Sequence, residues 1–193
     1  TCTFYEMPEA IRRASMKNIT LDDANRVGAI KWLKNFYDTY DKNPNQKGLY
    51  LHGSFGSGKT YLISAMLNEL AKKNVDITVV YYPELLRSLK EAFETDFASR
   101  ISKLKRVSIL FLDDIGAESL TSWARDEILG TILQYRMENH LPTFFTSNLT
   151  IEELETSLSI TSSGVDKVKA RRIIERIKQL TTDLELISKN RRD

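Results

Sequence analysis

The feature that most constrains this chain is a glycine-rich octapeptide, because its pattern requires a strand before it and a helix after it. The octapeptide has the form G-x-x-x-x-G-K-T and consists of Gly53, Ser54, Phe55, Gly56, Ser57, Gly58, Lys59 and Thr60. Its glycines allow successive backbone N–H groups to curl around phosphates, Lys59 can reach the β and γ oxygens, and the Thr60 hydroxyl can ligate Mg²⁺. A predicted strand (48–52) and a predicted helix (59–72) flank it, which makes a glycine turn that matches by chance the weaker interpretation. The octapeptide therefore predicts a site for a nucleotide such as ATP.

Apolar runs of strand length alternate with helical patterns, which is typical of a parallel α/β sheet. The runs cover residues 48–52, 77–81, 107–112, 142–147 and 184–187. We expect an α/β fold of three layers with a central five-stranded parallel sheet, in which 107–112 is buried on both faces. Outside these runs we expect irregular structure before a helix at 24–40, a polar connection at 95–106, one helix at 122–139 and a mobile loop at 159–166.

Length and composition bound what the chain can be. Its 193 residues fit one domain, and its net charge of +2 gives no general attraction to nucleic acid, so any DNA contact requires a local patch. The single cysteine, Cys2, excludes an intramolecular disulfide and fits a reducing cytoplasm. No apolar run approaches the roughly 18 residues of a membrane span. Because the chain starts at Thr1 and shows no signal peptide, we expect a cytoplasmic piece of a longer protein.

A second motif ends the most apolar strand, where the run ILFL is followed by two carboxylates, Asp113 and Asp114. Asp113 is placed to hold the Mg²⁺ shell, and Asp114 can polarise the attacking water. An isolated strand that ends in Asp-Asp would be interpreted as a solvated turn. The upstream phosphate-binding loop reverses that preference, and together the two motifs predict nucleotide hydrolysis.

A third signal is the run TSN at the end of the predicted strand 142–147. Strand ends converge on the ligand crevice of a parallel sheet, so Asn148 can orient the lytic water or touch the γ-phosphate. The alternative is an ordinary turn before a helix that Thr150 caps. Only the first two motifs make the catalytic interpretation preferable.

A fourth signal is a set of arginines near the end of the chain: Arg171, Arg172, Arg176, Arg191 and Arg192. An arginine finger supplied by a neighbouring subunit stabilises charge on the transferred phosphoryl group, and it needs an exposed guanidinium at a subunit edge. Charge runs on helices are more often solvated faces, and spacing alone favours that interpretation.

With these motifs the whole chain resembles the AAA+ domain of the DnaC/DnaI-type bacterial replicative-helicase loaders. The resemblance rests on KGLYLHGSFGSGKT at 47–60, FLDDIGAE at 111–118, TSN at 146–148 and ARRIIERI at 170–177. It implies an AAA+ ATPase core at 47–193 without a C-terminal helical lid, and a lead-in segment and helix at 1–46 that pack on this core. It also implies that Asn148 is sensor 1, that Arg176 is the arginine finger, and that Arg192, or alternatively Arg191, stands in for sensor 2.

The resemblance further implies partners. The hexameric replicative helicase would bind through an N-terminal domain that is absent from this chain, and ATP would bridge self-associated copies. Single-stranded DNA would contact Lys90 and Phe93 on the helix after the second strand, and Trp123 on the helix after the acidic pair. An aromatic ring can stack on a base and a lysine can contact a phosphate, although Phe93 fits an apolar packing face equally well. Many AAA+ ATPases carry Asp-Glu at the acidic pair, so the shorter Asp114 implies slow hydrolysis.

We therefore expect the ATP-binding and slowly hydrolysing motor domain of a helicase loader that acts in the initiation of DNA replication. Three alternatives share the phosphate-binding loop. One is a transposase-helper ATPase of similar fold, and a second is a P-loop small-molecule kinase, for which no substrate-closing lid is predicted. In the third, ATP is only a structural ligand of a binding module. Co-purification with a helicase, a phosphoryl-transfer screen and measured turnover would separate these alternatives.

Overall fold

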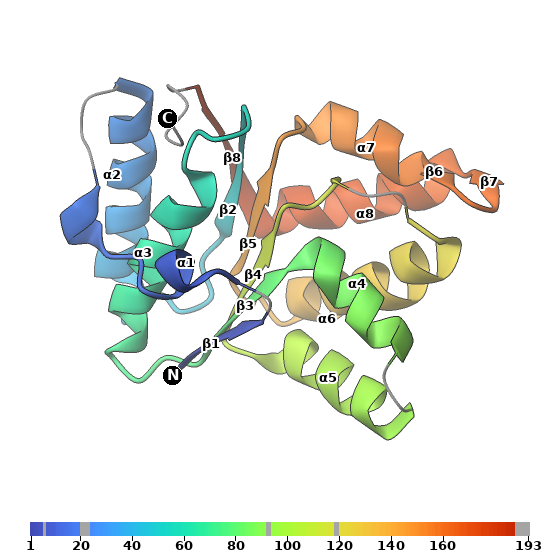
Figure 1. Cartoon of the computed structure of the whole chain (residues 1–193), viewed down its shortest axis with the longest axis horizontal. Helices are drawn as coiled ribbons and strands as arrows, with labels where there is room; N and C mark the ends of the chain where they lie inside the picture. The colour runs from blue at the N-terminus through green and yellow to red at the C-terminus, as the bar shows by residue number, and fades with distance from the viewer. Residues whose placement is uncertain (6, 20–23, 92–93, 118–119, 188–193) are drawn as a thin grey trace.

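A parallel sheet of six strands forms the centre of the molecule, in the order β1-β3-β4-β5-β2-β8 (Figure 1). The computed structural model describes residues 1–5, 7–19, 24–91, 94–117 and 120–187. The strands are β1 (Cys2–Tyr5), β2 (Gly48–Gly53), β3 (Ile77–Tyr81), β4 (Ile109–Asp113), β5 (Thr143–Ser147) and β8 (Thr181–Leu186). The expected α/β fold with a central parallel sheet is confirmed, and the sheet has one strand more than the five expected.

Helices cover both faces of this sheet and make the outer two layers (Figure 1). The bounds of the longer helices are α2 (Ala24–Thr39), α3 (Lys59–Ala71), α4 (Tyr82–Glu91), α5 (Glu94–Arg106), α6 (Thr131–Glu138), α7 (Ile151–Ser159) and α8 (Lys167–Leu180). The helices α2 and α3 share one apolar core with the sheet, and the helices from α4 to α8 share the other. Every residue of β4 is buried, because β3 and β5 flank it and helices cover both of its faces. Of the helices in the described part of the chain, none is long and apolar enough to cross a bilayer.

The opening of the chain, which we expected to be irregular, forms β1, a short helix α1 (Glu9–Arg12) and a 3₁₀ turn η1 (Met16–Asn18). β1 pairs in parallel with β3 at the sheet edge. The next residues lie along α3, where the Asn68 side chain donates to the carbonyl oxygens of Arg12 (3.2 Å) and Ala14 (3.0 Å). The backbone N–H of Ser15 donates to the Tyr61 hydroxyl at 3.1 Å. The lead-in segment is thus joined to the sheet as well as packed on it, while the division at residues 46 and 47 stays a prediction.

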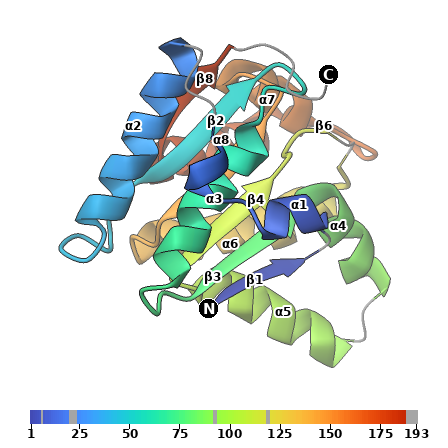
Figure 2. The ribbon, with the colours of Figure 1, turned by 60° about the vertical axis from the view of Figure 1, so that its left-hand side comes forward.

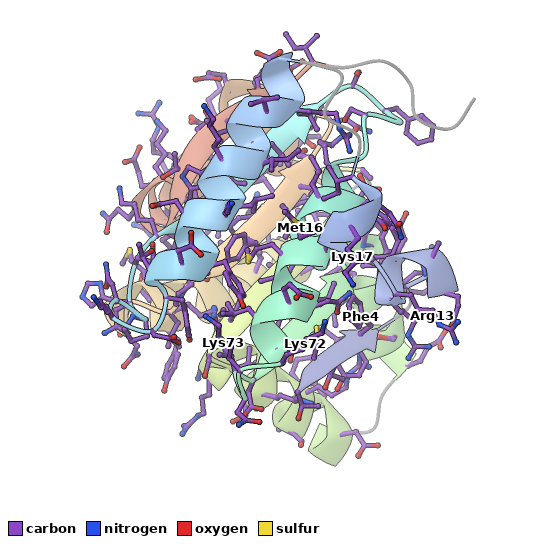
Figure 3. The ribbon with its side chains drawn as sticks, turned by 90° about the vertical axis from the view of Figure 1, so that its left-hand side faces the viewer. Phe4, Arg13, Met16, Lys17, Lys72 and Lys73 are labelled. Atoms are coloured by element: carbon purple, nitrogen blue, oxygen red, sulfur yellow. The ribbon has the colours of Figure 1, made fainter. Side chains whose placement is uncertain are left out.

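Figures 2 and 3 show this lead-in segment from the side of α3. Phe4 of β1 and Met16 of η1 lie beside α3, and Lys72 and Lys73 follow the carboxyl end of that helix (Figure 3). Phe4 and Met16 pack against the apolar core on this face of the sheet. The first residues of the chain therefore contact the helix that begins in the glycine-rich octapeptide.

Two connections are more ordered than expected. The polar stretch before β4 is the helix α5, whose apolar side chains Phe97, Ile101 and Leu104 recur at helical spacing and face the core. The expected mobile loop contains a hairpin of β6 (Ile160–Thr161) and β7 (Gly164–Val165). The expected helix at 122–139 is present, but its first part, η2 (Ala124–Gly130), is a π-helix that continues into α6.

A buried arginine joins three elements at the amino ends of the strands. Arg136 of α6 is fully buried and donates to backbone carbonyl oxygens at the end of α5 and before β4 and β5, and to the Thr143 hydroxyl at 2.8 Å. Burial lowers the pKa of this guanidinium. Two of the last carbonyls of α5, those of Leu104 and Lys105, thus accept from a cation, which is a favourable arrangement at a helix carboxyl end.

Candidate nucleotide-binding site

The glycine-rich octapeptide lies where its mechanism requires, between the end of β2 at Gly53 and the start of α3 at Lys59. Gly56 (φ 79°) and Gly58 (φ 90°) have left-handed backbone conformations that favour glycine. Gly53 is restricted for another reason, since a Cβ atom there would lie 2.1 Å from the carbonyl oxygen of Leu186 on β8. The first glycine is therefore required by the neighbouring strand as well as by any phosphate.

Lys59 brings the loop and the end of β5 together. Its Nζ donates to the carbonyl oxygens of Gly53 (3.1 Å) and Ser54 (3.0 Å) and to Oδ1 of Asn148 (3.0 Å). Lys59 and Asn148 are 89 positions apart in the sequence, so only the parallel strand order places them side by side. Asn148 therefore lies at the loop, as expected of a residue that touches the γ-phosphate.

Asp113 is the buried centre of a second group. Its Oδ1 accepts from the Thr60 hydroxyl at 2.7 Å and from the Thr146 hydroxyl at 2.6 Å. Burial raises the pKa of the Asp113 carboxyl above its ordinary value, and the hydrogen bonds from Thr146 and Thr60 act in the opposite direction. A carboxylate and a hydroxyl in contact are the oxygen ligands that Mg²⁺ prefers, and a divalent cation would offset the burial of the negative charge. The side chains present fit the metal that the sequence predicts.

Asp114 follows in a left-handed conformation (φ 62°), which is uncommon for a residue other than glycine. Its backbone N–H donates to the Thr146 hydroxyl at 2.9 Å, and its Oδ2 accepts from the Tyr81 hydroxyl at 3.4 Å. Hydrogen bonds from two neighbouring strands therefore hold this turn. The side chain of Asp114 lies next to Asp113, where a water-polarising carboxylate is expected.

Three residues contact this site although no motif of the sequence assigns them a role there: Thr146, Tyr81 and Arg26. Thr146 belongs to the TSN run, but its contact with Asp113 depends on the neighbouring strands β4 and β5. Tyr81 ends β3 and is the register partner of Asp113, which a strand-end comparison could have indicated. Arg26 is a buried residue of α2 whose Nη1 donates to the carbonyl oxygen of Ser57 at 3.1 Å, and no sequence pattern pointed to it.

The arginine-bearing helix α8 lies on the other face of the sheet from α3 (Figure 1). Arg176 is half-buried there, and its Nη1 donates to the carbonyl oxygen of Gly130 at 3.1 Å, where η2 ends. A Cβ atom on Gly130 would lie 3.2 Å from that Nη1 atom. Burial and the neighbouring Arg172 lower the pKa of the Arg176 guanidinium. The chain therefore does not bring Arg176 to its own loop, and Arg191 and Arg192 lie outside the described residues.

Of the DNA-contact candidates, Trp123 can be placed. It precedes η2, is 39% exposed and stacks on Phe97 of α5 with ring centroids 5.5 Å apart. Lys90 lies on α4, but its side chain is outside the described part of the structure, and so is Phe93. Trp123 thus belongs to a partly exposed aromatic pair with Phe97, and its contact with DNA stays a prediction.

The site as a whole collects a cation, a carboxylate with a hydroxyl, a second carboxylate and an amide at the carboxyl ends of β2, β4 and β5. These are the groups needed to hold a nucleoside triphosphate with a divalent cation and to orient an attacking water.

Known proteins are similar to this chain in sequence and in fold. The protein-family model described as IstB-like ATP binding protein matches residues 35–185. The replicative helicase loader DnaI of Bacillus subtilis is 40% identical over 181 residues, which are 93% of this chain and 58% of that protein. A crystal structure of DnaI has a TM-score of 0.85 and 46% identity, and the match covers 99% of this chain and 97% of that one. AMPPCP-bound DnaA from Aquifex aeolicus shares the fold, with a TM-score of 0.71 and 19% identity over 90% of this chain and 50% of that one. The chain spans a little over half the length of the curated DnaI protein.

Proposed function

This chain belongs to the family of IstB-like ATP-binding proteins and has an AAA+ domain of the DnaI and DnaC type, and on that premise we propose that it is the ATP-hydrolysing motor domain of a replicative-helicase loader. The observation that carries the proposal is the contact of Lys59 with Asn148 beside the pair Thr60 and Asp113. A whole protein of this kind would deliver the hexameric helicase to single-stranded DNA when replication starts, and would act in the cytoplasm.

Hydrolysis would use the groups that the sheet brings together. Lys59 and the loop N–H groups would bind the β and γ phosphates, and Thr60 and Asp113 would hold Mg²⁺, which when bound neutralises charge on these phosphates. Asp114 would accept a hydrogen bond from the attacking water, and Asn148 would orient that water. An aspartate reaches less far than a glutamate at this place, so turnover of the isolated domain would be slow.

Assembly would complete the site. Arg176 lies away from its own loop, so it would stabilise the γ-phosphate of a neighbouring copy. Trp123 would stack on a base of single-stranded DNA. We propose that the helicase contact is made by an N-terminal domain, as the resemblance implies, and not by the residues that match 58% of DnaI.

The experiment that tests the proposal uses the full-length protein, its host's replicative helicase and a circular single strand. The parent protein should load the helicase, as measured by strand unwinding, and Lys59→Ala should bind the helicase but fail to load it because ATP binding is lost. Failure of the parent to bind or load the helicase, with co-purification of a transposase instead, would favour the transposase-helper alternative. ATP binding without any turnover would contradict the ATPase assignment.

A further inference from the structure

The helix α2 places a buried cation against the glycine-rich octapeptide. Arg26 lies in the first turn of α2 and is only 5% exposed. Its Nη1 donates to the carbonyl oxygen of Ser57 at 3.1 Å, across 31 positions of the sequence. Ala29 and Leu33 of α2 belong to the same apolar core as α3, so packing of the whole helix fixes the place of the guanidinium. Arginine is rarely buried to this degree, and its position at the octapeptide therefore needs a physical reason.

Ser57, which accepts from Arg26, is the most enclosed residue of the octapeptide. It is fully buried, and its N–H donates to the carbonyl oxygen of Ser54 at 3.3 Å. Its hydroxyl accepts from the Nζ atom of Lys59 at 3.4 Å. Two cations thus contact the two oxygens of Ser57, Lys59 at the hydroxyl and Arg26 at the carbonyl. Lys59 belongs to the octapeptide, whereas Arg26 supports Ser57 from a different element.

The carbonyl that Arg26 contacts belongs to the peptide unit between Ser57 and Gly58. The described part of the chain has no cis peptide bond, so the Ser57 carbonyl and the Gly58 N–H point in opposite directions. A donor at the carbonyl therefore turns the Gly58 N–H away from Arg26. A loop of this kind directs such N–H groups at phosphates. The hydrogen bond from a cation also polarises the peptide unit and makes its N–H a stronger donor.

Gly58 is the residue of the octapeptide for which this support matters most. It has a left-handed conformation (φ 90°) and is the N-cap of α3. A glycine has no side chain that could accept from the first N–H groups of the helix, and an anion satisfies such groups. The orientation of the peptide unit before Gly58 therefore affects how well the amino end of α3 binds phosphate.

We infer that Arg26 is a positioning residue, which holds the peptide unit between Ser57 and Gly58 in the orientation that binds the phosphates of ATP. It acts through this peptide unit and does not contact the nucleotide itself. This role rests on the proposed function, and it assigns part of the nucleotide affinity to α2, which lies outside the predicted core at 47–193. The Gly58 N–H would bind phosphate in the ground state and in the transition state alike. Loss of Arg26 should therefore weaken ATP binding more than it slows hydrolysis.

The test measures three affinities of the full-length protein, for ATP and ADP with Mg²⁺ and for inorganic tripolyphosphate, by competition with a fluorescent ATP analogue. Arg26→Met removes both the charge and the donor, and should weaken all three about tenfold, the usual worth of one hydrogen bond to a charged group. Tripolyphosphate should lose as much as ATP, because a peptide N–H binds phosphate with or without a base. Arg26→Lys keeps a cationic donor and should recover most of the affinity. Lys34→Met removes an exposed cation of α2 and should bind all three ligands like the parent.

Two results overturn this role. One is parent-like affinity of Arg26→Met, and the other is a loss confined to ATP and ADP, which would show that Arg26 contacts the base or the ribose. If thermal unfolding shows that Arg26→Met does not keep the fold, Arg26→Gln takes its place and should bind tripolyphosphate less tightly than Arg26→Lys, because it lacks the charge.

Turnover with helicase adds a second readout. The KM for ATP should rise about tenfold in the neutral variant, and kcat should fall much less. A fall in kcat larger than the rise in KM would show that Arg26 acts on the reaction itself, which also overturns the role of a positioning residue. Failure of the proposed function is read separately, from a parent protein that binds neither ATP nor helicase.

Discussion

The nucleotide site and the arginine helix differ in how much of each is completed within one chain. At the nucleotide site, Lys59 donates to Asn148, and Thr60 and Thr146 donate to Asp113, all through short hydrogen bonds. Asp113 is also buried. At the arginine helix, the guanidinium of Arg176 donates to the Gly130 carbonyl, and the side chains of Val165, just before this helix, and Val168, in its first turn, are exposed. The groups proposed to act inside the chain are thus fixed before a ligand arrives, whereas Arg176, which is proposed to act on a neighbour, is only half-buried.

This difference has an energetic reason. Groups that are fixed before a reaction need no reorganisation when charge develops in the transition state. Burial and mutual hydrogen bonds therefore favour catalysis at a site that is complete within one chain. A residue that acts across a subunit boundary must remain partly hydrated in the free chain. Its contribution therefore depends on assembly, and variants in the two regions should respond differently to assembly.

The largest effect is expected for Arg176→Ala. The variant should keep the parent's ATP affinity and, when assembled with helicase, lose hydrolysis by roughly 10³-fold, because a finger acts on the transition state of a neighbour. Lys178→Ala removes another exposed cation of α8 and should change turnover little.

A mixture then locates the action of Arg176. Lys59→Ala alone should lose ATP binding, and mixing it with Arg176→Ala should restore part of the hydrolysis, because some shared sites contain both native residues. Confirmed assembly without any recovery would show that Arg176 acts within its own chain.

A smaller effect is expected for Trp123→Ala, which tests whether the partly exposed ring of Trp123 contacts DNA. Single-strand affinity should fall by about 1 to 3 kcal/mol, with little dependence on sequence, because one stacked base is lost. Trp123→Phe keeps a ring over Phe97 and should retain most of the affinity. DNA titrations in which Trp123→Ala matches the parent would place the contacts elsewhere.

Acid should act on the nucleotide site through Asp113. Its pKa is raised in the folded chain, so between the ordinary value and the raised value the folded state binds more protons than the unfolded state. In the absence of ligands this carboxyl therefore contributes stability at low pH that is lost as pH rises through the folded pKa. Binding of Mg²⁺ needs the carboxylate, so Mg²⁺-dependent nucleotide affinity should show the opposite trend and fall as pH falls through the same range.

The variant Thr146→Val sharpens this prediction. It removes a hydrogen bond to the carboxylate, so it should raise the Asp113 pKa further and weaken Mg²⁺-dependent affinity by about tenfold near neutral pH, the usual worth of one hydrogen bond to a charged group. The control is Thr78→Val, since the Thr78 hydroxyl is buried on β3 and has no hydrogen-bond partner among the described residues. Equal pH profiles for Thr146→Val and the parent would contradict the assignment.

The smallest effect is expected for Gly130→Ala. A methyl group at this position would crowd the Arg176 guanidinium, while the loss of glycine from a helix interior favours folding by roughly 0.5 to 1 kcal/mol. Turnover of the assembled protein should fall a few-fold without any loss of thermal stability. A fall in stability with unchanged turnover would show that Gly130 only packs against α8.

The sequence was sufficient for the parts of the fold that depend on local pattern. The octapeptide, the buried strand before Asp113 and the order of strands and helices are each indicated by residues that are contiguous in the sequence. The family was indicated by the resemblance. β1 was missed because its four residues become a strand only by pairing with the edge of β3. α5 was not predicted because most of its residues are polar. Its apolar residues at helical spacing, Phe97, Ile101 and Leu104, form only a short pattern.

The candidate site was predicted in the same uneven way. Lys59, Thr60 and Asp113 follow from motifs, whereas Tyr81, Thr146 and Arg26 act through contacts between segments that lie far apart in the chain. The role of Arg176 is of a third kind, because no arrangement within a single chain can test it. It stays a prediction, as do the roles of Arg191, Arg192, Lys90 and Phe93.

The π-helix η2 affects what happens to the structure when a homologue has one residue fewer in this helix. A π-turn closes its hydrogen bonds between residues i and i+5, one more than an α-turn, so it holds a single residue that an α-helix would not need. Removing one residue between Ala124 and Gly130 would convert the turn to α-helix and rotate Trp123 by about 100° relative to α6. Homologues with a one-residue deletion here are therefore expected to have lost, or relocated, the aromatic residue at the position of Trp123.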